Sequence, residues 1–231
     1  MTISGFIRSL FAASALAGMV LMNAASASII PGYPDAVETA FDAREVALLP
    51  HYCIYTKLFR LSVPGGDNKA EIDRWRAAMG PAFDWMHHYC WGLMKTNRAL
   101  LLAKDKRTKT FYFTDAIAEF DYFLNRASPS RDFVLLPELF TKKGENLIRL
   151  GRGVEGVTEL ERAIELKRDY WPPYADLSDY YESKGDVAKA REVLKAGLSY
   201  APDAKALTRR LAELDSAKEK KRPSQRETSG G

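Results

Sequence analysis

The chain has 231 residues, of which 46% are hydrophobic and 28% are charged, and its formal net charge is +4 at pH 7. This composition is typical of a folded domain and argues against a disordered chain. The positive excess lies in Arg8 and in the tail from Ser216 to Gly231. The remaining body is balanced in charge and offers no basic face to a nucleic acid.

The first residues have the features of an export signal. Arg8 supplies a positive start, an apolar run extends from Leu10 to Met22, and residues 25–27 have the small-x-small pattern that signal peptidase cuts. The apolar run is shorter than the roughly 20 residues that cross a bilayer as a helix. We therefore expect residues 1–27 to be removed, leaving a soluble periplasmic or secreted protein of a bacterial cell envelope.

Residues 28–80 are predicted to form an N-terminal helical cap. Prolines and a glycine favour an extended conformation up to about residue 42, and a turn is expected over residues 64–68. Short helices are expected over Ala43–Leu49, His51–Leu61 and Lys69–Met79. Such a region can cover the exposed end of a helical array.

Two longer apolar patterns with helical spacing follow. They predict a helix over Trp85–Ala103 and a second helix over Phe113–Ala127. Residues 104–110 are expected to form an enlarged loop between them. Together these elements are predicted to form a degenerate helix pair over residues 84–127.

A repeat of 34 residues is present between Pro137 and Pro202. Shifting the first copy by this length places large residues on large ones and small on small: Phe140 on Tyr174, Gly144 on Ser178, Leu147 on Tyr181, Gly151 on Gly185, Leu160 on Leu194 and Ala163 on Gly197. In each copy a glycine separates two apolar stripes and can end the first helix. The pattern predicts helix pairs over 137–170 and 171–204, a closing helix over 205–215 and a disordered basic tail over 216–231.

The repeated residues resemble the tetratricopeptide repeat family. The second copy carries the family pattern in Tyr174, Leu177, Ser178, Tyr181, Gly185, Ala190, Leu194, Gly197 and Pro202. The first copy departs from it at Lys143, Gly156 and Arg168, where the family has leucine, alanine and proline. The resemblance covers about a third of the chain. It implies an all-α fold over residues 81–215, in which antiparallel helix pairs stack as a short right-handed solenoid with one continuous apolar interior from Pro137 onward.

In that family, the first helix of each pair lines a concave surface that binds partners. The register carries this surface onto Glu138, Thr141, Glu145, Arg149, Ala175, Asp179, Glu182 and Arg209. Its acidic to mixed character implies a basic or neutral protein or peptide partner. The Lys and Asn pattern with which some relatives hold a terminal carboxylate is absent. These positions are equally compatible with ordinary solvated helix faces.

The predicted helix over Trp85–Ala103 is rich in aromatic residues and carries cations near its end. Because aromatic and arginine side chains concentrate in binding surfaces, Trp91, Lys95 and Arg98 are further candidates for partner binding. Large rings at helical spacing more often belong to a core.

All histidines and cysteines fall in two similar tetrads, Pro50–Cys53 and His87–Cys90. One interpretation is a disulfide between Cys53 and Cys90, which is natural in an exported protein. The alternatives are buried thiols that only pack, or a zinc or copper site. Residues two apart on a helix point in different directions, which disfavours the metal site.

A basic segment and the lack of catalytic motifs complete the sequence signals. Cations in the predicted loop could contact anionic lipids or glycans, or simply be solvated: Lys104, Lys106, Arg107 and Lys109. The chain contains no Gly-x-Ser-x-Gly, His-Glu-x-x-His or Cys-x-x-Cys motif, and Gly65-Gly66 lacks the ending of a phosphate-binding loop.

The sequence therefore favours a non-catalytic interaction scaffold of the cell envelope that needs no cofactor. The alternatives are a metal- or thiol-dependent protein centred on the two tetrads and a polyanion-binding accessory protein that uses the basic segment and tail.

Overall fold

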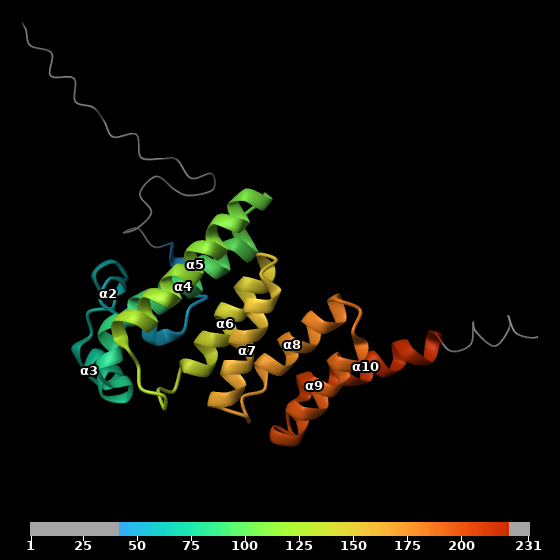
Figure 1. The fold of residues 1–231 in the computed structure, drawn as a ribbon. Coiled ribbons are helices and arrows are strands. Elements are labelled where there is room, and N and C mark those ends of the chain that lie inside the picture. The colour runs from blue at the N-terminus through green and yellow to red at the C-terminus, as the bar shows by residue number, and fades with distance from the viewer. Residues whose placement is uncertain (1–41, 222–231) are drawn as a thin grey trace, which may run out of the picture.

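The computed structural model describes residues 42–221, with side chains up to Ser216. Over this range the chain is helical and contains no β-strand, and helices adjacent in sequence pack as pairs (Figure 1). The predicted all-α class is confirmed. None of the described helices combines the length and hydrophobicity needed to cross a membrane. The predicted signal peptide, 1–27, and the extended segment up to residue 41 lie outside the described residues.

Short helices build the N-terminal part: α1 (Ala43–Val46), the 3-10 helix η1 (His51–Tyr55), α2 (Phe59–Ser62), α3 (Lys69–Met79) and the 3-10 helix η2 (Gly80–Trp85). The side chain of Asn68 accepts a hydrogen bond from the Glu71 amide and starts α3 at the predicted residue. Pro50 separates α1 from η1, as predicted. The predicted helix over His51–Leu61 is divided into η1 and α2.

The next elements form a hairpin: α4 (Met86–Asn97), the π-helical turn η3 (Arg98–Leu102) and α5 (Lys106–Ala127). The two long helices approach closely because Gly92 has no side chain. A Cβ atom there would lie 2.3 Å from the ring of Phe120. The prediction of a loop over residues 104–110 is wrong, since α5 begins at Lys106. The Asp105 carboxylate caps it, accepting hydrogen bonds from the Thr108 amide (2.9 Å) and hydroxyl (2.7 Å).

The repeated region forms two helix pairs: α6 (Leu136–Arg149) with α7 (Gly153–Leu166), and α8 (Pro172–Ser183) with α9 (Val187–Tyr200). The turns inside the pairs match at the predicted shift. Gly151 and Gly185 have φ of +81° and +80°, a conformation that side chains with a Cβ rarely adopt. The residue after each glycine donates its amide to a carbonyl of the preceding helix over 2.9 Å.

Small residues allow close contact within each pair. A Cβ atom on Gly144 of α6 would lie 2.9 Å from the carbonyl oxygen of Gly156 in α7. In the second pair, a Cβ atom on Gly197 of α9 would lie 2.8 Å from Cγ of Tyr174 in α8. The pairs therefore depend on residues that the repeat comparison aligned as small.

The helix α10 (Lys205–Lys221) packs against α9 and α8. It continues beyond the predicted end at Asp215, into residues that the sequence indicated as a disordered tail. The rest of that tail, residues 222–231, lies outside the described residues.

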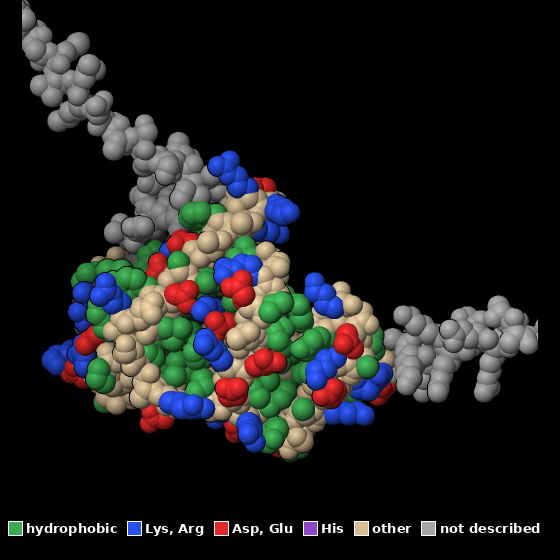
Figure 2. Space-filling view, in the orientation of Figure 1, with side chains coloured by type: hydrophobic (Ala, Val, Ile, Leu, Met, Phe, Trp, Pro, Cys, Tyr) green, Lys and Arg blue, Asp and Glu red, His purple; other side chains and the backbone are tan. Residues whose placement is uncertain are grey.

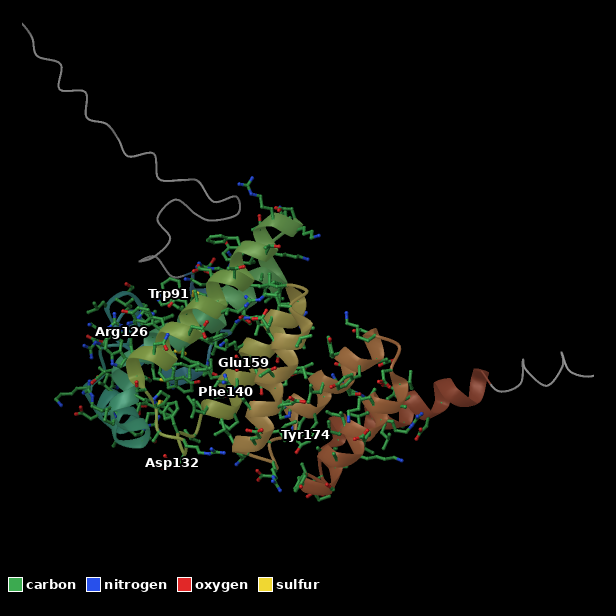
Figure 3. All side chains as sticks on the ribbon, in the orientation of Figure 1. Trp91, Arg126, Asp132, Phe140, Glu159 and Tyr174 are labelled. Carbon is green, nitrogen blue, oxygen red and sulfur yellow. A yellow bond between two sulfur atoms is a disulfide. The ribbon has the colours of Figure 1, made fainter. Side chains whose placement is uncertain are left out.

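Buried apolar side chains form two main clusters. The first extends from Leu49 through α4 and α5 to Leu139, and the second joins α8, α9 and α10 around Leu194. The pair α6–α7 links them. Phe140 of α6 packs against the first cluster (Figure 3), and Ile164 of α7 packs against the second. The interior from Pro137 onward is therefore two linked clusters and not the single uninterrupted core that we expected.

Candidate functional site

The first helices of the successive pairs form one face. The helix α8 contacts both α6 and α10, and each junction carries a hollow. The hollow between α6 and α8, of about 280 Å³, is lined by Glu145, Ile148, Arg149, Asp176, Asp179, Tyr180 and Ser183. The hollow between α8 and α10, of about 500 Å³, is lined by Ser178, Asp179, Glu182, Arg209, Arg210, Glu213 and Leu214. We call the two hollows together the groove; they share Asp179.

The structure brings most of the exposed predicted residues together in this groove. Glu145 and Arg149 line its first hollow, Glu182 and Arg209 line its second, and Asp179 belongs to both. These residues come from three helices that are far apart in sequence. The repeat register thus placed them on a shared surface, as the sequence predicted.

Other predicted groove residues point elsewhere. Thr141 and Ala175 are buried, and the Thr141 hydroxyl donates a hydrogen bond to the Pro137 carbonyl (2.7 Å). Glu138 is half-buried and lies near Tyr89, where burial and then neighbouring charges, including that of Glu138, raise the tyrosine pKa. The prediction that Thr141 and Ala175 line an open surface is wrong, because neighbouring elements cover both side chains. Glu138 lines neither hollow.

The candidates on α4 are also buried. Trp91 packs against Phe59 with a centroid distance of 5.7 Å, as the core interpretation of the aromatic cluster implied. The Lys95 ammonium lies 2.7 Å from carboxylate oxygens of both Asp115 and Glu119 in α5. These contacts hold α4 against its neighbours and keep the Trp91 ring and the Lys95 ammonium inside the protein.

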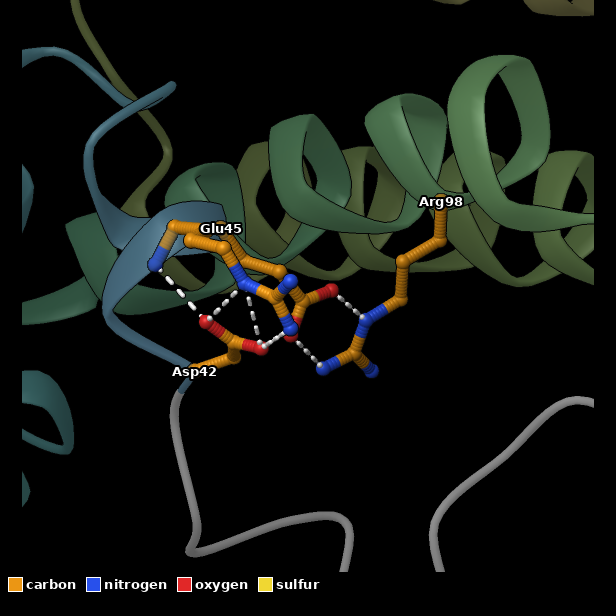
Figure 4. A network of polar contacts seen from close by, with 4 residues as sticks. Asp42, Glu45 and Arg98 are labelled. Atoms are coloured by element: carbon orange, nitrogen blue, oxygen red, sulfur yellow. Dashed lines mark hydrogen bonds and ion pairs between the residues drawn. The ribbon is translucent and has the colours of Figure 1, made fainter.

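Arg98 ties α4 to the start of the described chain. Its guanidinium donates hydrogen bonds to the Glu45 carboxylate in α1, one of them 2.9 Å long (Figure 4). The residue is 2% exposed. The expectation that Arg98 is available to a partner is therefore wrong in this structure, because the pair with Glu45 occupies that surface.

The electrostatics of the groove centre on Asp176, which sequence analysis missed. Burial, followed by the charge of Glu145, raises the pKa of Asp176 to about 7, while Lys142 acts in the opposite direction. Glu145 is held by Lys142 at 2.8 Å, and Asp179 by Arg210 at 2.9 Å. Three carboxyl groups thus share the hollow between α6 and α8, and a cationic group entering it would be favoured.

The repeat register contained a signal for these missed residues, Lys142, Asp176 and Arg210. Lys142, Asp176 and Arg210 follow Thr141, Ala175 and Arg209, so they occupy equivalent positions in successive helices. Had the residue directly after each predicted position also been considered, Asp176 and Arg210 would have been identified.

Of the interpretations of the two tetrads, the disulfide is the one that the structure confirms. Cys53 and Cys90 form a disulfide, with a Cα–Cα distance of 5.7 Å, and both residues are fully buried. Their sulfurs are therefore unavailable for thiol exchange or for metal coordination. His88 instead lies 2.6 Å from the Glu119 carboxylate. Within residues 42–216, no group of His, Cys, Asp and Glu has the arrangement of a metal site.

The predicted basic loop lies at the tip of the α4–α5 hairpin. Lys104 precedes α5, whereas Lys106, Arg107 and Lys109 belong to its first turn, and all are exposed. This tip is separate from the groove.

Comparison with known proteins adds no relative: the chain matches no known protein family, no curated protein and no solved structure.

Proposed function

We propose that the chain is a non-catalytic scaffold that binds a peptide segment of another protein in the groove formed by α6, α8 and α10. The observation that supports this proposal is the pair of adjoining hollows that share Asp179. A peptide in extended conformation can pass from one hollow to the next across that residue. A peptide that contacts several helices also gains specificity from their fixed spacing.

We further propose that residues 81–215 form a solenoid of the tetratricopeptide type. The matching turns at Gly151 and Gly185 and the close contacts at Gly144 and Gly197 support this architecture. In such an array, the first helices present the concave binding surface. The groove lies on these helices.

The preferred partner segment carries a lysine or arginine. Its cation would enter the hollow between α6 and α8, beside Glu145, Asp176 and Asp179. A cation in this hollow favours the ionised form of Asp176. The ionised carboxylate then attracts the cation in addition to Glu145 and Asp179. We propose that this interaction takes place in the bacterial cell envelope, where the chain would join parts of a larger assembly; the apolar run and cleavage pattern of residues 1–27 support this location.

The proposal predicts selective loss of binding when groove carboxylates are neutralised. An array of peptides that differ in lysine and arginine content identifies a basic peptide, whose affinity is then measured by fluorescence polarisation. The double variant E145Q/D179N should bind that peptide roughly tenfold more weakly, because two carboxylates beside the cation are lost.

The control variant E161Q/E165Q removes two exposed carboxylates of α7 that line neither hollow. It should bind like the unmodified protein. Equal loss in both variants, or a preference for acidic peptides, would contradict the proposed groove.

A further inference from the structure

The tip of the α4–α5 hairpin projects beyond the neighbouring helix pair α6–α7 (Figure 1). It contains the π-helical turn η3, closed by a hydrogen bond of 2.9 Å from the Ala103 amide to the Arg98 carbonyl. Single π turns are rare and occur often at functional sites. This tip is unusual in two further respects, its apolar surface and its charge.

Three successive leucines are exposed at this tip. Leu100, Leu101 and Leu102 retain 43%, 63% and 54% of their accessible surface. Scattered single leucines are common on protein surfaces, whereas a run of three exposed leucines is unfavourable in water and is typical of an interaction surface.

Four cations follow the leucines within the next seven residues. Lys104, Lys106, Arg107 and Lys109 are all exposed, and Lys and Arg side chains gather at this tip in Figure 2. The first turn of α5 contains no acidic residue, and the N-cap Asp105 is the single acid among residues 104–109, so the tip keeps a net positive charge at a helix N-terminus, where the helix dipole disfavours cations. The nearest acids further along α5, Asp115 and Glu119, pair with Lys95 instead.

We propose that this tip docks on a membrane surface that contains anionic phospholipids. The leucines would enter the boundary between headgroups and acyl chains, while the cations contact the headgroup phosphates. This partner removes both local conflicts at once, because it covers the apolar run and neutralises the net positive charge that remains beside Asp105. A soluble polyanion would neutralise the cations and leave the leucines in water.

Vesicle binding by the full chain tests the proposal. The protein is mixed with vesicles of phosphatidylcholine alone, or of phosphatidylcholine and phosphatidylglycerol in equal parts, and bound protein is measured by sedimentation. Binding should require phosphatidylglycerol and weaken as salt concentration rises. Amide hydrogen exchange of residues 98–109 should slow on the anionic vesicles, which locates the contact at the tip and not in the N-terminal apolar run.

Two variants separate the contributions of charge and apolar surface. Replacing all four cations by alanine should weaken binding by more than a hundredfold, at roughly fivefold for each charge. The variant L101S/L102S should weaken it by at least about tenfold without changing the net charge. A charge-matched control replaces exposed cations outside the tip and should retain binding: Lys57, Arg131, Lys195 and Lys205.

Several results would overturn membrane docking. If L101S/L102S binds anionic vesicles like the unmodified protein, and dextran sulfate competes fully, the tip is a site for soluble polyanions. Equal loss in the charge-matched control would show that only overall charge matters. Unchanged hydrogen exchange at residues 98–109 would place any vesicle contact elsewhere in the chain.

Discussion

Asp176 shows how one carboxyl group can connect the stability of the fold with the charge of the groove. Burial and the charge of Glu145 both disfavour the ionised form of Asp176, so its carboxyl group keeps a proton at pH values where a solvated aspartate has lost it. At neutral pH the hollow between α6 and α8 therefore carries less negative charge than its residues suggest. A partner cation would lower the pKa of Asp176 and favour its ionised form. The hollow would then carry one more negative charge when the cation is bound than when it is absent.

We predict that D176N stabilises the protein more at about pH 8 than at about pH 5. The pKa of Asp176 is raised from 3.8 to about 7 in the folded state, so between these values the folded protein holds a proton that the unfolded chain has lost. Raising the pH through this window lowers the contribution of this group to the free energy of unfolding. Asparagine cannot ionise, so D176N does not lose this contribution. Its free energy of unfolding should therefore exceed that of the unmodified protein by on the order of 1 kcal/mol at about pH 8.

Urea unfolding of both proteins at the two pH values measures this difference. The comparison between variants matters because His87 acts in the opposite sense. Burial lowers the pKa of His87 to about 4, so its contribution is lost as the pH falls below its ordinary value of 6.5. This contribution is common to both proteins and cancels. A difference between D176N and the unmodified protein that does not grow with pH would contradict the raised pKa.

At the level of elements, the contacts of Lys143 explain why the first copy of the repeat differs here from the tetratricopeptide pattern that it resembles. The lysine of α6 occupies a position where leucine is expected, and its ammonium lies 2.7 Å from Asp121 in α5 and 2.9 Å from Glu159 in α7. Burial lowers the pKa of Lys143, but hydrogen bonds to the two carboxylates outweigh this effect and raise it. One side chain thus joins three consecutive helices by charge.

We expect K143L, which introduces the residue found at the equivalent position of the second copy, Leu177, to destabilise the protein by about 1 to 3 kcal/mol. The substitution keeps an apolar stem but leaves the mostly buried Glu159 without this cation. The double variant K143L/E159Q should recover part of the loss, because the buried carboxylate that would keep only Arg162 as its cation is removed together with Lys143. Thermal unfolding of the two variants tests this interpretation. If K143L is as stable as the unmodified protein, the ion pairs do not hold α6 between its neighbours.

Sequence reasoning succeeded where short-range rules or the repeat determine the structure. The start of α3 follows from the Asn68 cap, and the turns at Gly151 and Gly185 follow from the shift of 34 residues. It failed for the start of α5, although Asp105 is itself a recognisable cap. It also failed for Lys95, whose burial depends on Asp115 and Glu119, two carboxylates one helical turn apart on another helix. Spacing within one helix does not reveal which neighbour covers it.

The two main apolar clusters of the described residues are stabilised differently. The first cluster contains the disulfide that joins η1 to α4, and the second contains only helix packing around Leu194 and Leu207. The α6–α7 pair lies between them and contributes side chains to both. Helical arrays in which each unit contacts only its neighbours can open locally. The groove spans the junctions of α6 with α8 and of α8 with α10, away from the disulfide.

We therefore predict that C53S/C90S destabilises the first cluster selectively. The disulfide joins residues separated by 37 positions, and its removal should lower the free energy of unfolding by at most about 4 kcal/mol through the greater freedom of the unfolded segment. Hydrogen exchange should accelerate between Leu49 and Met94 and change little between Tyr174 and Leu214. The reciprocal variant, L207A, leaves a cavity in the second cluster and should produce the opposite pattern. Equal acceleration in both regions for both variants would show that the clusters unfold as one cooperative unit, because separate units transmit little of each other's instability.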